Sequence, residues 1–473
     1  MDQSDLSAMD HAAKDALIRF LLAENAELKS RTTALEVRLS KDSHNSSKPP
    51  SSDGLRKPAP KSLRHMGQRP KGGQKGHKGS ALERVAKPDQ VIIHPLPATC
   101  DACGSTLDEA HVLEARQIFD ITPQQVEVTE HRVLEARCTC GKVHRSDFPK
   151  GFTATTQYGP RVQATVVYLT QHHMLPILRT ARILRDTCGV ALSPGAVVRM
   201  IHTAAGNLIP TVARIADAVR DARVAHFDDT GMRVASKLHW LHTAATQTLT
   251  WVGMHTRRGQ EAFDAFGILP EFQGAAIHDG WALYWKYDCL YGLCNAHHLR
   301  ELTLVHEQYD QRWAKHMIDL LVAANRDVAE GPFSDDRMEQ VNSDYTAILA
   351  QGDKVHPIKK HKDGSAQRSQ SYPTNLLRRL REYRDDVLRF LSDPEVPFTN
   401  NIAEQAVRMP TVKQNISGCF RTANGAAAFC TIQSYLETLR KQGVDLLHAL
   451  VHSFQGVSPQ AATGKRPLVN SYE

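Results

Sequence analysis

The spacing of apolar residues predicts a coiled coil near the N-terminus. Within residues 14–40, one set of helical seam positions recurs every seven residues, and leucine fills the second seam position throughout. Leucine at one seam position and a single asparagine at the other are typical of a parallel two-stranded coiled coil. The alternative is an amphipathic helix that packs on its own chain. The seam residues are Ile18, Leu21, Asn25, Leu28, Thr32, Leu35 and Leu39.

Runs that alternate apolar and polar residues predict a small β-rich unit over residues 88–150. Two cysteine pairs bracket most of these runs, Cys100 with Cys103 and Cys138 with Cys140. Thiolates in two closely spaced pairs supply a tetrahedral Zn²⁺ site, and such a metal compensates for a small core. The unit is therefore predicted to hold one structural zinc ion. The predicted strands are residues 91–96, 115–121, 126–138 and 142–148.

Residues 155–220 have a helical period and predict two helices separated by a turn at Gly189. The second helix is expected to begin at Ser193 and Pro194, because serine caps helices and proline suits their first position. This spacing is compatible with a helix–turn–helix element that reads DNA. A helical pair that packs on a catalytic core is the alternative.

Strand and helix patterns then alternate as expected for an α/β core that begins over residues 221–298. Residues 299–395 are helical by period and are expected to form an insertion. Residues 396–450 complete the core, and residues 451–473 form a tail. The predicted core strands are residues 222–228, 237–246, 248–255, 274–279 and 290–298. The predicted core helices are residues 259–267, 281–287, 400–409 and 425–441.

Three acidic residues stand out as candidate metal ligands. Asp228 and Asp279 close short apolar runs, so we expect their carboxylates at the ends of buried strands, whereas Glu404 lies in the first turns of a helix. Hard divalent cations bind through a few carboxylates together with substrate phosphates. The three residues therefore predict a site for two Mg²⁺ or Mn²⁺ ions that catalyses phosphoryl transfer. Turns at the two aspartates, and a capping box formed by Asn401 and Glu404, are the alternatives.

The length of the chain indicates several domains, and its charge distribution indicates a binding partner. A chain of 473 residues suggests about three domains. It contains no apolar run of about 20 residues and no signal-peptide pattern, so a cytoplasmic protein is expected. Its net charge is +7, but nine basic residues and one acidic residue between Lys48 and Lys78 give that stretch +8.

Residues 41–85 are therefore predicted to be a basic Ser/Pro/Gly-rich linker that binds phosphate backbones. A solvated linker that binds nothing is the alternative. The predicted DNA contacts in the linker are Lys57, Lys61, Arg64, Arg69, Lys71, Lys75 and Lys78. The predicted contacts near the acidic residues are His298, Arg300, Arg408, Lys413 and Arg421.

The motifs around the acidic residues resemble those of the insertion sequence 66 family of transposases. They are HFDDTG, HDGWALY with LCNAHHLREL, and TNNIAEQAVR with KQNISGCFRTANGA, preceded by DSHNSSKPPSSDG and GGQKGHKG. The resemblance runs from about residue 15 to about residue 450. It implies an RNase H-like core whose Asp-Asp-Glu triad falls on Asp228, Asp279 and Glu404, and a zinc-binding domain before it. One departure is Asp229, where the family usually has glutamate.

The resemblance also implies a function. A protein of this kind would cleave the 3′ ends of an insertion sequence at its terminal inverted repeats and join them to target DNA, with Mg²⁺ as cofactor. It would act as a homodimer or higher oligomer at the nucleoid, together with accessory proteins of the same element. The fold class expected is a multidomain α/β protein. A zinc-containing DNA-binding regulator and an RNase H-like nuclease without strand transfer are the alternatives.

Overall fold

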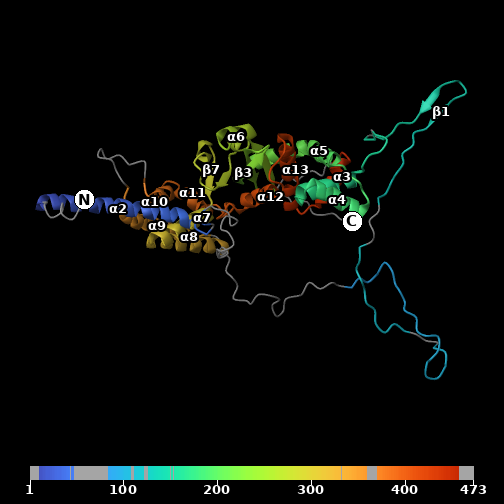
Figure 1. The fold of residues 1–473 in the computed structure, drawn as a ribbon, viewed down its shortest axis with the longest axis horizontal. Coiled ribbons are helices and arrows are strands. Elements are labelled where there is room, and N and C mark those ends of the chain that lie inside the picture. The colour runs from blue at the N-terminus through green and yellow to red at the C-terminus, as the bar shows by residue number, and fades with distance from the viewer. Residues whose placement is uncertain are drawn as a thin grey trace.

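The computed structural model is built around a mixed five-stranded sheet (Figure 1). It describes residues 10–42, 44–46, 84–107, 111–121, 126–149, 151–152, 154–331, 333–358 and 370–457. The sheet order is β5-β4-β3-β6-β7, with β3, β4 and β5 antiparallel and both β6 and β7 parallel to β3. The strands are β3 (Val224–Val234), β4 (Lys237–Ala245), β5 (Thr250–His255), β6 (Ala275–His278) and β7 (Leu290–Leu293).

Successive side chains of the strands point to opposite faces of the sheet, and each face has its own core. Ala225, Phe227 and Ala276 belong to a core shared with helices that lie N- and C-terminal to the sheet. Ile277 and Leu293 belong to a second core, shared with the inserted helices. The helices of the first core are α3 (Pro160–Val167), α5 (Pro194–Arg220), α6 (Gln260–Phe266), α13 (Ala423–Lys441) and α14 (Leu446–Phe454).

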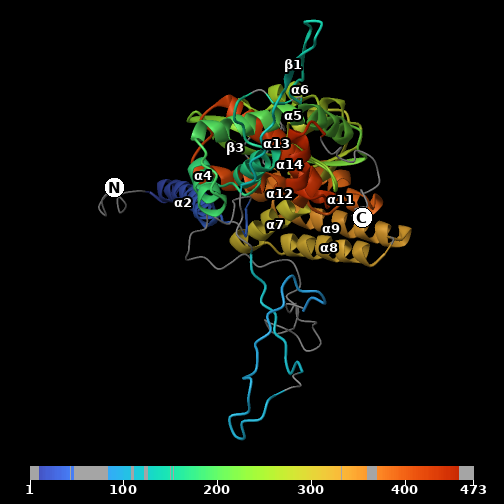
Figure 2. The same ribbon diagram turned by 90° about the vertical axis from the view of Figure 1, so that its right-hand side faces the viewer.

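The residues predicted to form a helical insertion fold as a bundle of helices that begins directly after β7. Figure 2 shows its helices on the far side of the sheet from α5. Large apolar side chains such as Trp313, Tyr345 and Leu377 are buried inside the bundle. The helices are α7 (Asn295–Tyr309), α8 (Arg312–Glu330), α9 (Asp335–Val355), α10 (Tyr372–Glu382) and α11 (Arg384–Ser392).

The outer edge of the sheet is covered by helix α13. The hydroxyl of Ser434 accepts a hydrogen bond from the backbone N–H of Val252 (2.8 Å), and the hydroxyl of Thr438 accepts one from Thr250 (2.9 Å). Unpaired N–H groups on an edge strand are a template for aggregation and must otherwise be hydrated. The hydroxyls of α13 therefore accept hydrogen bonds from edge N–H groups of β5 and fix the helix against the sheet.

The pair of helices before the sheet has the turn, and the start of the second helix, that the sequence predicted. Gly189 ends α4 (Ile177–Cys188) in the left-handed conformation, and Ser193 caps α5 through the N–H of Ala196. One face of α5 is buried along its length in the first core. This agrees with the alternative prediction that the helical pair packs on the core. Reading of DNA by this helical pair stays a prediction.

Several predicted elements differ from the structure. Residues 281–287 form only a 3₁₀ turn (Tyr284–Lys286), because Tyr284 and its neighbours pack as separate aromatic anchors around Phe263 and His278 rather than along one helical face. The strands expected over residues 91–96 and 115–121 are irregular. Between residues 84 and 149, the described strands are β1 (Glu135–Arg137) and β2 (Val143–Arg145), paired antiparallel.

The zinc-module segments expose their apolar side chains. Ile93, Leu113 and Ile118 have relative exposures of 81%, 93% and 94%. Figures 1 and 2 both show β1 projecting away from the main body. A segment that buries so little apolar surface needs another source of stabilisation, which a bound metal can provide.

Helix α2 (His11–Ser40) confirms the helix predicted near the N-terminus. Its C-terminal end contacts the insertion, where Val37 is buried and the Lys41 ammonium lies 4.7 Å from the centre of the Tyr372 ring. The heptad leucines are not covered by the chain itself: Leu21, Leu28 and Leu35 are 51–57% exposed. The linker residues predicted to contact DNA, from Lys57 to Lys78, lie outside the described residues. Within the described segments, no helix combines the length and hydrophobicity that a bilayer span requires.

The exposed leucine seam predicts self-association through α2. Replacing Leu21, Leu28 and Leu35 with glutamate should convert the oligomer to monomer, because seam leucines provide most of the buried area of a coiled coil. Light scattering coupled to size exclusion measures the change. The paired control, Arg19→Glu with Glu27→Lys, keeps the net charge and leaves the seam intact. Equal masses for the wild type and the leucine variant would show that α2 does not dimerise.

Candidate active site

The carboxyl ends of the three parallel strands meet at one edge of the sheet. Asp279 directly follows β6, and Cys294 directly follows β7. Asp228 does not end its strand, which corrects the sequence expectation: β3 continues to Val234 because its antiparallel pairing with β4 continues. The parallel pairing of β3 with β6 does stop at His226, two residues before Asp228. Asp228 thus lies just beyond the parallel part of the sheet, the usual position for a ligand site.

Asp228 is held in an environment that disfavours its charge. Burial raises its pKa to about 8, and the charges of Asp279, Asp229 and Glu404 add to this rise. The N–H of Asp229 donates a hydrogen bond to the Asp228 carboxylate (2.8 Å) and opposes the shift. Partial desolvation also raises the pKa of Asp279, whose carboxylate accepts a hydrogen bond from the N–H of Trp281 (3.0 Å). The carboxylates therefore concentrate negative charge in one place.

Asp229 has a partner of its own. Its carboxylate, 4% exposed, receives two hydrogen bonds from the Arg258 guanidinium, at 2.7 and 3.2 Å. The guanidinium lies over the rings of Trp281 (4.1 Å) and Trp240 (4.8 Å). A bidentate pair with stacking on both rings fixes the arginine in one orientation. Asp229 is thereby committed to Arg258, while Asp228 is left for a ligand.

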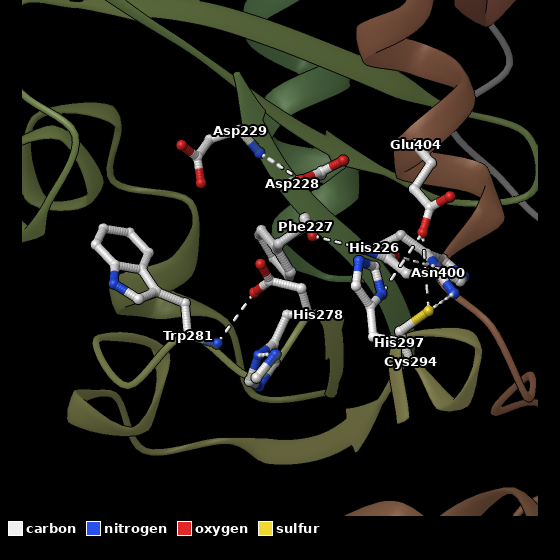
Figure 3. A network of polar contacts seen from close by, with 12 residues as sticks. His226, Phe227, Asp228, Asp229, His278, Trp281, Cys294, His297, Asn400 and Glu404 are labelled. Atoms are coloured by element: carbon white, nitrogen blue, oxygen red, sulfur yellow. Dashed lines mark hydrogen bonds and ion pairs between the residues drawn. The ribbon is translucent and has the colours of Figure 1, made fainter. Parts of the chain in front are cut away.

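Asn400 joins the segments that carry the acidic residues (Figure 3). Its amide nitrogen donates to the carbonyl of Phe227 (2.8 Å), and its amide oxygen lies 3.0 Å from Nδ1 of His226. Its backbone N–H donates to Sγ of Cys294 (3.2 Å). The side chain is buried, so these bonds form away from water. One residue thus ties the start of α12 (Asn401–Ser417) to β3 and to the end of β7.

Glu404 faces the sheet from the first turn of α12. Its Oε1 lies 3.8 Å from both Sγ of Cys294 and Nδ1 of His297, as Figure 3 shows. The capping-box alternative is wrong, because Asn400 is the N-cap residue and no side chain caps the helix. The pKa of Asp228 responds to the charge of Glu404, so the glutamate shares the neighbourhood of the aspartates.

The far end of α12 is also fixed to β3. The Gln414 side chain accepts a hydrogen bond from the N–H of Arg233 (2.7 Å). Phe420, in the loop after the helix, exchanges backbone hydrogen bonds with Arg233 and Ala235. Helix α12 therefore crosses β3 with both ends held, and the position of Glu404 follows from that crossing.

The donor set of the three acidic residues fits hard divalent cations. It offers carboxylate oxygens from β3, from the end of β6 and from α12. The pKa of Asp228 is raised mainly by burial and further by neighbouring negative charge, and a cation would offset both. Arg258 offsets part of this charge but is engaged by Asp229. These residues could hold Mg²⁺ or Mn²⁺.

The five residues near this site that were predicted to contact DNA differ in their exposure to solvent. His298 is wrong as a phosphate ligand, because it is 5% exposed and its Nδ1 lies 3.1 Å from Asn295 Oδ1. Lys413 is partly buried and donates to the carbonyl of Thr170 (3.4 Å), so it faces the interior. Arg300 is partly buried, whereas Arg408 and Arg421 are exposed. DNA contact by the last two stays a prediction.

The two cysteine pairs occupy similar turns but are not brought together. Gly104 and Gly141 follow the pairs in the left-handed conformation, and their N–H groups donate back to the carbonyls of Cys100 and Cys138. Hydrogen bonding to Ser105 lowers the pKa of the Cys103 thiol. Each turn thus has the form of half a zinc site. No three of the four sulfur atoms gather within the described residues.

Sequence reasoning missed two supports of the site. Asn400 lies in the TNNIAE motif, but nothing in the sequence says that its side chain reaches β3 rather than its own helix. Arg258 is one of many arginines, and its role arises only where Trp240, Trp281 and Asp229 converge.

Comparison with known families places the chain among transposases. Residues 155–428 match the model described as Transposase IS66 family, and residues 97–141 match the zinc-finger binding domain of transposase IS66. Residues 2–83 match a family of unknown function (DUF6444). The first match covers more than half of the chain, so the protein belongs to the transposase IS66 family. The zinc-finger match supports a structural zinc ion, and the resemblance noted in the sequence is confirmed.

A curated relative is similar over a shorter region. "Uncharacterized protein y4jO" of Sinorhizobium fredii (strain NBRC 101917 / NGR234) is 31% identical over 91 residues. The match covers 18% of this chain and 28% of that relative. The chain therefore spans little more than a quarter of the length of the curated relative.

The raised pKa of Asp228 predicts pH-dependent metal binding. Below about pH 8 its carboxyl holds a proton that a cation must displace, and above that pH it is ionised. The apparent Kd for Mn²⁺ should therefore fall about tenfold per unit from pH 6 to pH 8 and then level off. Electron paramagnetic resonance of free Mn²⁺ measures this. Asp228→Asn should flatten the slope, and Glu271→Gln should not; a flat wild-type profile would contradict the prediction.

The bridging role of Asn400 predicts a large loss of stability on truncation. Asn400→Ala removes the side-chain bonds to Phe227 and His226 and leaves a buried carbonyl without its donor. We expect the free energy of unfolding to fall by about 2–4 kcal/mol. The exposed neighbour provides the control, because Asn401→Ala should change it by less than about 0.5 kcal/mol. Similar values for the two variants in urea denaturation would argue against the bridge.

Proposed function

We propose that this protein is a DNA transposase that cleaves the 3′ ends of an insertion sequence at its terminal inverted repeats and joins them to target DNA. The observation that carries the proposal is that Asp228, Asp279 and Glu404 share one neighbourhood beside the carboxyl ends of the parallel strands, where the charges of Asp279 and Glu404 act on Asp228, although the three carboxylates do not all lie within 4.8 Å of one another. Membership in the transposase IS66 family supports the same function.

The core is proposed to be RNase H-like. Three antiparallel strands followed by two parallel strands give the order β5-β4-β3-β6-β7, and α12 crosses β3 beside the acidic residues. This topology brings carboxylates from the central strand, its parallel neighbour and a later helix to one place. The inserted bundle α7–α11 lies between the second and third carboxylates in the sequence without separating them in space.

Each acidic residue has a proposed role. Asp228, Asp279 and Glu404 would hold two divalent cations, Mg²⁺ or Mn²⁺. When bound, these ions lower the pKa of an attacking water or 3′-hydroxyl and stabilise the leaving oxygen. Asp229 and Arg258 would hold β3 in place so that Asp228 faces the DNA. Hydrolysis would expose a 3′-hydroxyl at the element end, and the same carboxylates would then position it against target DNA.

DNA and a second copy of the chain are the proposed partners. The exposed Arg408 and Arg421 follow Glu404 in the chain, on α12 and in the loop after it, where a phosphate backbone could run. The basic linker would add contacts that carry no base readout. A dimer formed through α2 would bring two linkers together, so that one complex could hold both ends of the element. Accessory proteins of the same element would complete it.

Two other functions are distinguished by activity. A DNA-binding regulator would bind the inverted repeats without nicking them, and a nuclease of the same fold would nick without joining. Of these two functions, only DNA-binding regulation makes no use of the buried carboxylate cluster. A cluster in which the pKa of Asp228 is raised to about 8 lowers the stability of the fold.

The catalytic proposal predicts that Asp228→Asn, Asp279→Asn and Glu404→Gln each abolish both cleavage and joining. Each change removes a ligand charge at nearly constant shape, so DNA binding should persist. Assays use labelled inverted-repeat DNA with Mg²⁺, and a mobility shift measures binding. Glu271→Gln, an exposed carboxylate elsewhere, serves as the matched control. Near-normal strand transfer by any of the three variants would remove that residue from the site.

The zinc proposal predicts one tightly held zinc ion per chain, bound by Cys100, Cys103, Cys138 and Cys140. Cys100→Ser or Cys138→Ser should lose it, and residues 88–150 should become more sensitive to protease, because the metal supplies their folding energy. Elemental analysis after dialysis against a weak chelator measures the metal. Cys188→Ser, whose thiol lies on α4, should retain it. Freshly purified protein without zinc would rule the site out.

A further inference from the structure

A second group of metal-ligand side chains lies beside the carboxylate cluster. Cys294 directly follows β7, His297 lies in the first turn of α7, and Glu404 lies in the first turn of α12. Within the described parts of the chain, this is the one group of three or more such residues whose ligand atoms all lie within 4.8 Å of one another. Figure 3 shows the thiol, the imidazole and the carboxylate converging.

The geometry of the group is close to that of a tetrahedral metal site. Glu404 Oε1 lies 3.8 Å from Cys294 Sγ and 3.8 Å from His297 Nδ1. Ligand atoms around a tetrahedral Zn²⁺ are separated by about 3.3–3.6 Å, as follows from its bond lengths. The two Glu404 distances exceed this range by a few tenths of an ångström, and the third, between Cys294 Sγ and His297 Nδ1, is at most 4.8 Å. Small side-chain shifts would therefore close the site and leave a fourth position open to water.

Two further observations point to a ligand. His297 Nδ1 is buried and has no hydrogen-bond partner among the described residues, which is unusual for an imidazole so placed. The N–H of Asn400 donates to Cys294 Sγ (3.2 Å), and a donor aimed at sulfur stabilises a metal-bound thiolate. The neighbouring segments thus hold both side chains ready for a cation.

We propose that Cys294, His297 and Glu404 bind a thiophilic divalent cation such as Zn²⁺ or Cd²⁺. Thiolate and imidazole ligands select these ions and discriminate against Mg²⁺, which prefers oxygen. On binding, the Cys294 thiol releases its proton to solvent. Because Glu404 belongs to both groups, the soft cation would withdraw its carboxylate from Asp228 and Asp279. That consequence, inhibition of DNA cleavage, rests on the proposed function, whereas the binding does not.

Cobalt binding tests the site directly. The full-length chain is prepared with Cys100, Cys103, Cys138 and Cys140 changed to serine, so that the zinc-module thiols do not contribute. Titration with Co²⁺ should give one equivalent of thiolate-bound metal, recognised by a thiolate-to-metal charge-transfer band and the intense visible bands of tetrahedral Co²⁺. Adding Cys294→Ser should abolish the charge-transfer band, and adding His297→Gln should weaken binding at least ~tenfold.

Matched controls keep the test decisive. Cys289→Ser removes a half-buried thiol just before β7 that lies outside the group, and the cobalt spectrum should not change. If circular dichroism shows that the Cys294→Ser variant is misfolded, the difference in Co²⁺ binding between the His297→Gln variant and the parent protein still tests the site. Absence of a charge-transfer band in the parent, or its persistence in folded Cys294→Ser, would overturn the proposal.

Inhibition is measured separately in the wild-type protein. Excess Zn²⁺ should reduce Mg²⁺-dependent cleavage of inverted-repeat DNA at least ~tenfold, and a chelator should restore it. His297→Gln should need a higher Zn²⁺ concentration for the same fractional inhibition. Cobalt binding with Zn²⁺-insensitive cleavage would overturn the withdrawal of Glu404. Cobalt binding without any Mg²⁺-dependent cleavage would support the site and refute the proposed function instead.

Discussion

Parallel pairing of β3, β6 and β7 is the constraint on which the candidate site depends. Strands that run in one direction end at one edge, and neighbouring strands lie about 4.8 Å apart. Residues just beyond their paired regions must therefore lie close together, whatever their separation in the sequence. Asp228, Asp279 and Cys294 occupy these positions, and Glu404 joins them because α12 is held across β3 at both ends.

A cluster of carboxylates repels itself, so the rest of the fold must hold it together. The two cores on opposite faces of the sheet supply that stabilisation at a distance from the charges. Nearer the site, Arg258 neutralises Asp229, and Asn400 uses neutral hydrogen bonds that place α12 without adding charge. Burial, with the remaining negative charge adding to it, raises the pKa of Asp228, and both effects make the same arrangement receptive to a cation.

The segments before the core are stabilised differently. Between residues 84 and 149 the described side chains are almost all exposed, so a fold there depends on thiolate–metal bonds. Helix α2 contacts the insertion only near its C-terminal end and leaves its leucines in water. The described side chains of both segments bury little apolar surface, whereas the sheet and its helices enclose extended apolar cores.

The sequence alone determined most secondary structure of the core, because strand alternation and helix caps such as Ser193 are local signals. It also singled out Asp228, Asp279 and Glu404 as candidates. Only the tertiary structure decided which neighbours serve them. It buried His298, turned Lys413 inward, paired Asp229 with Arg258 and sent the Asn400 side chain to β3. These outcomes depend on which segments meet in the fold, across 29 residues for Asp229 and Arg258 and across 173 for Phe227 and Asn400, and no local pattern encodes such meetings.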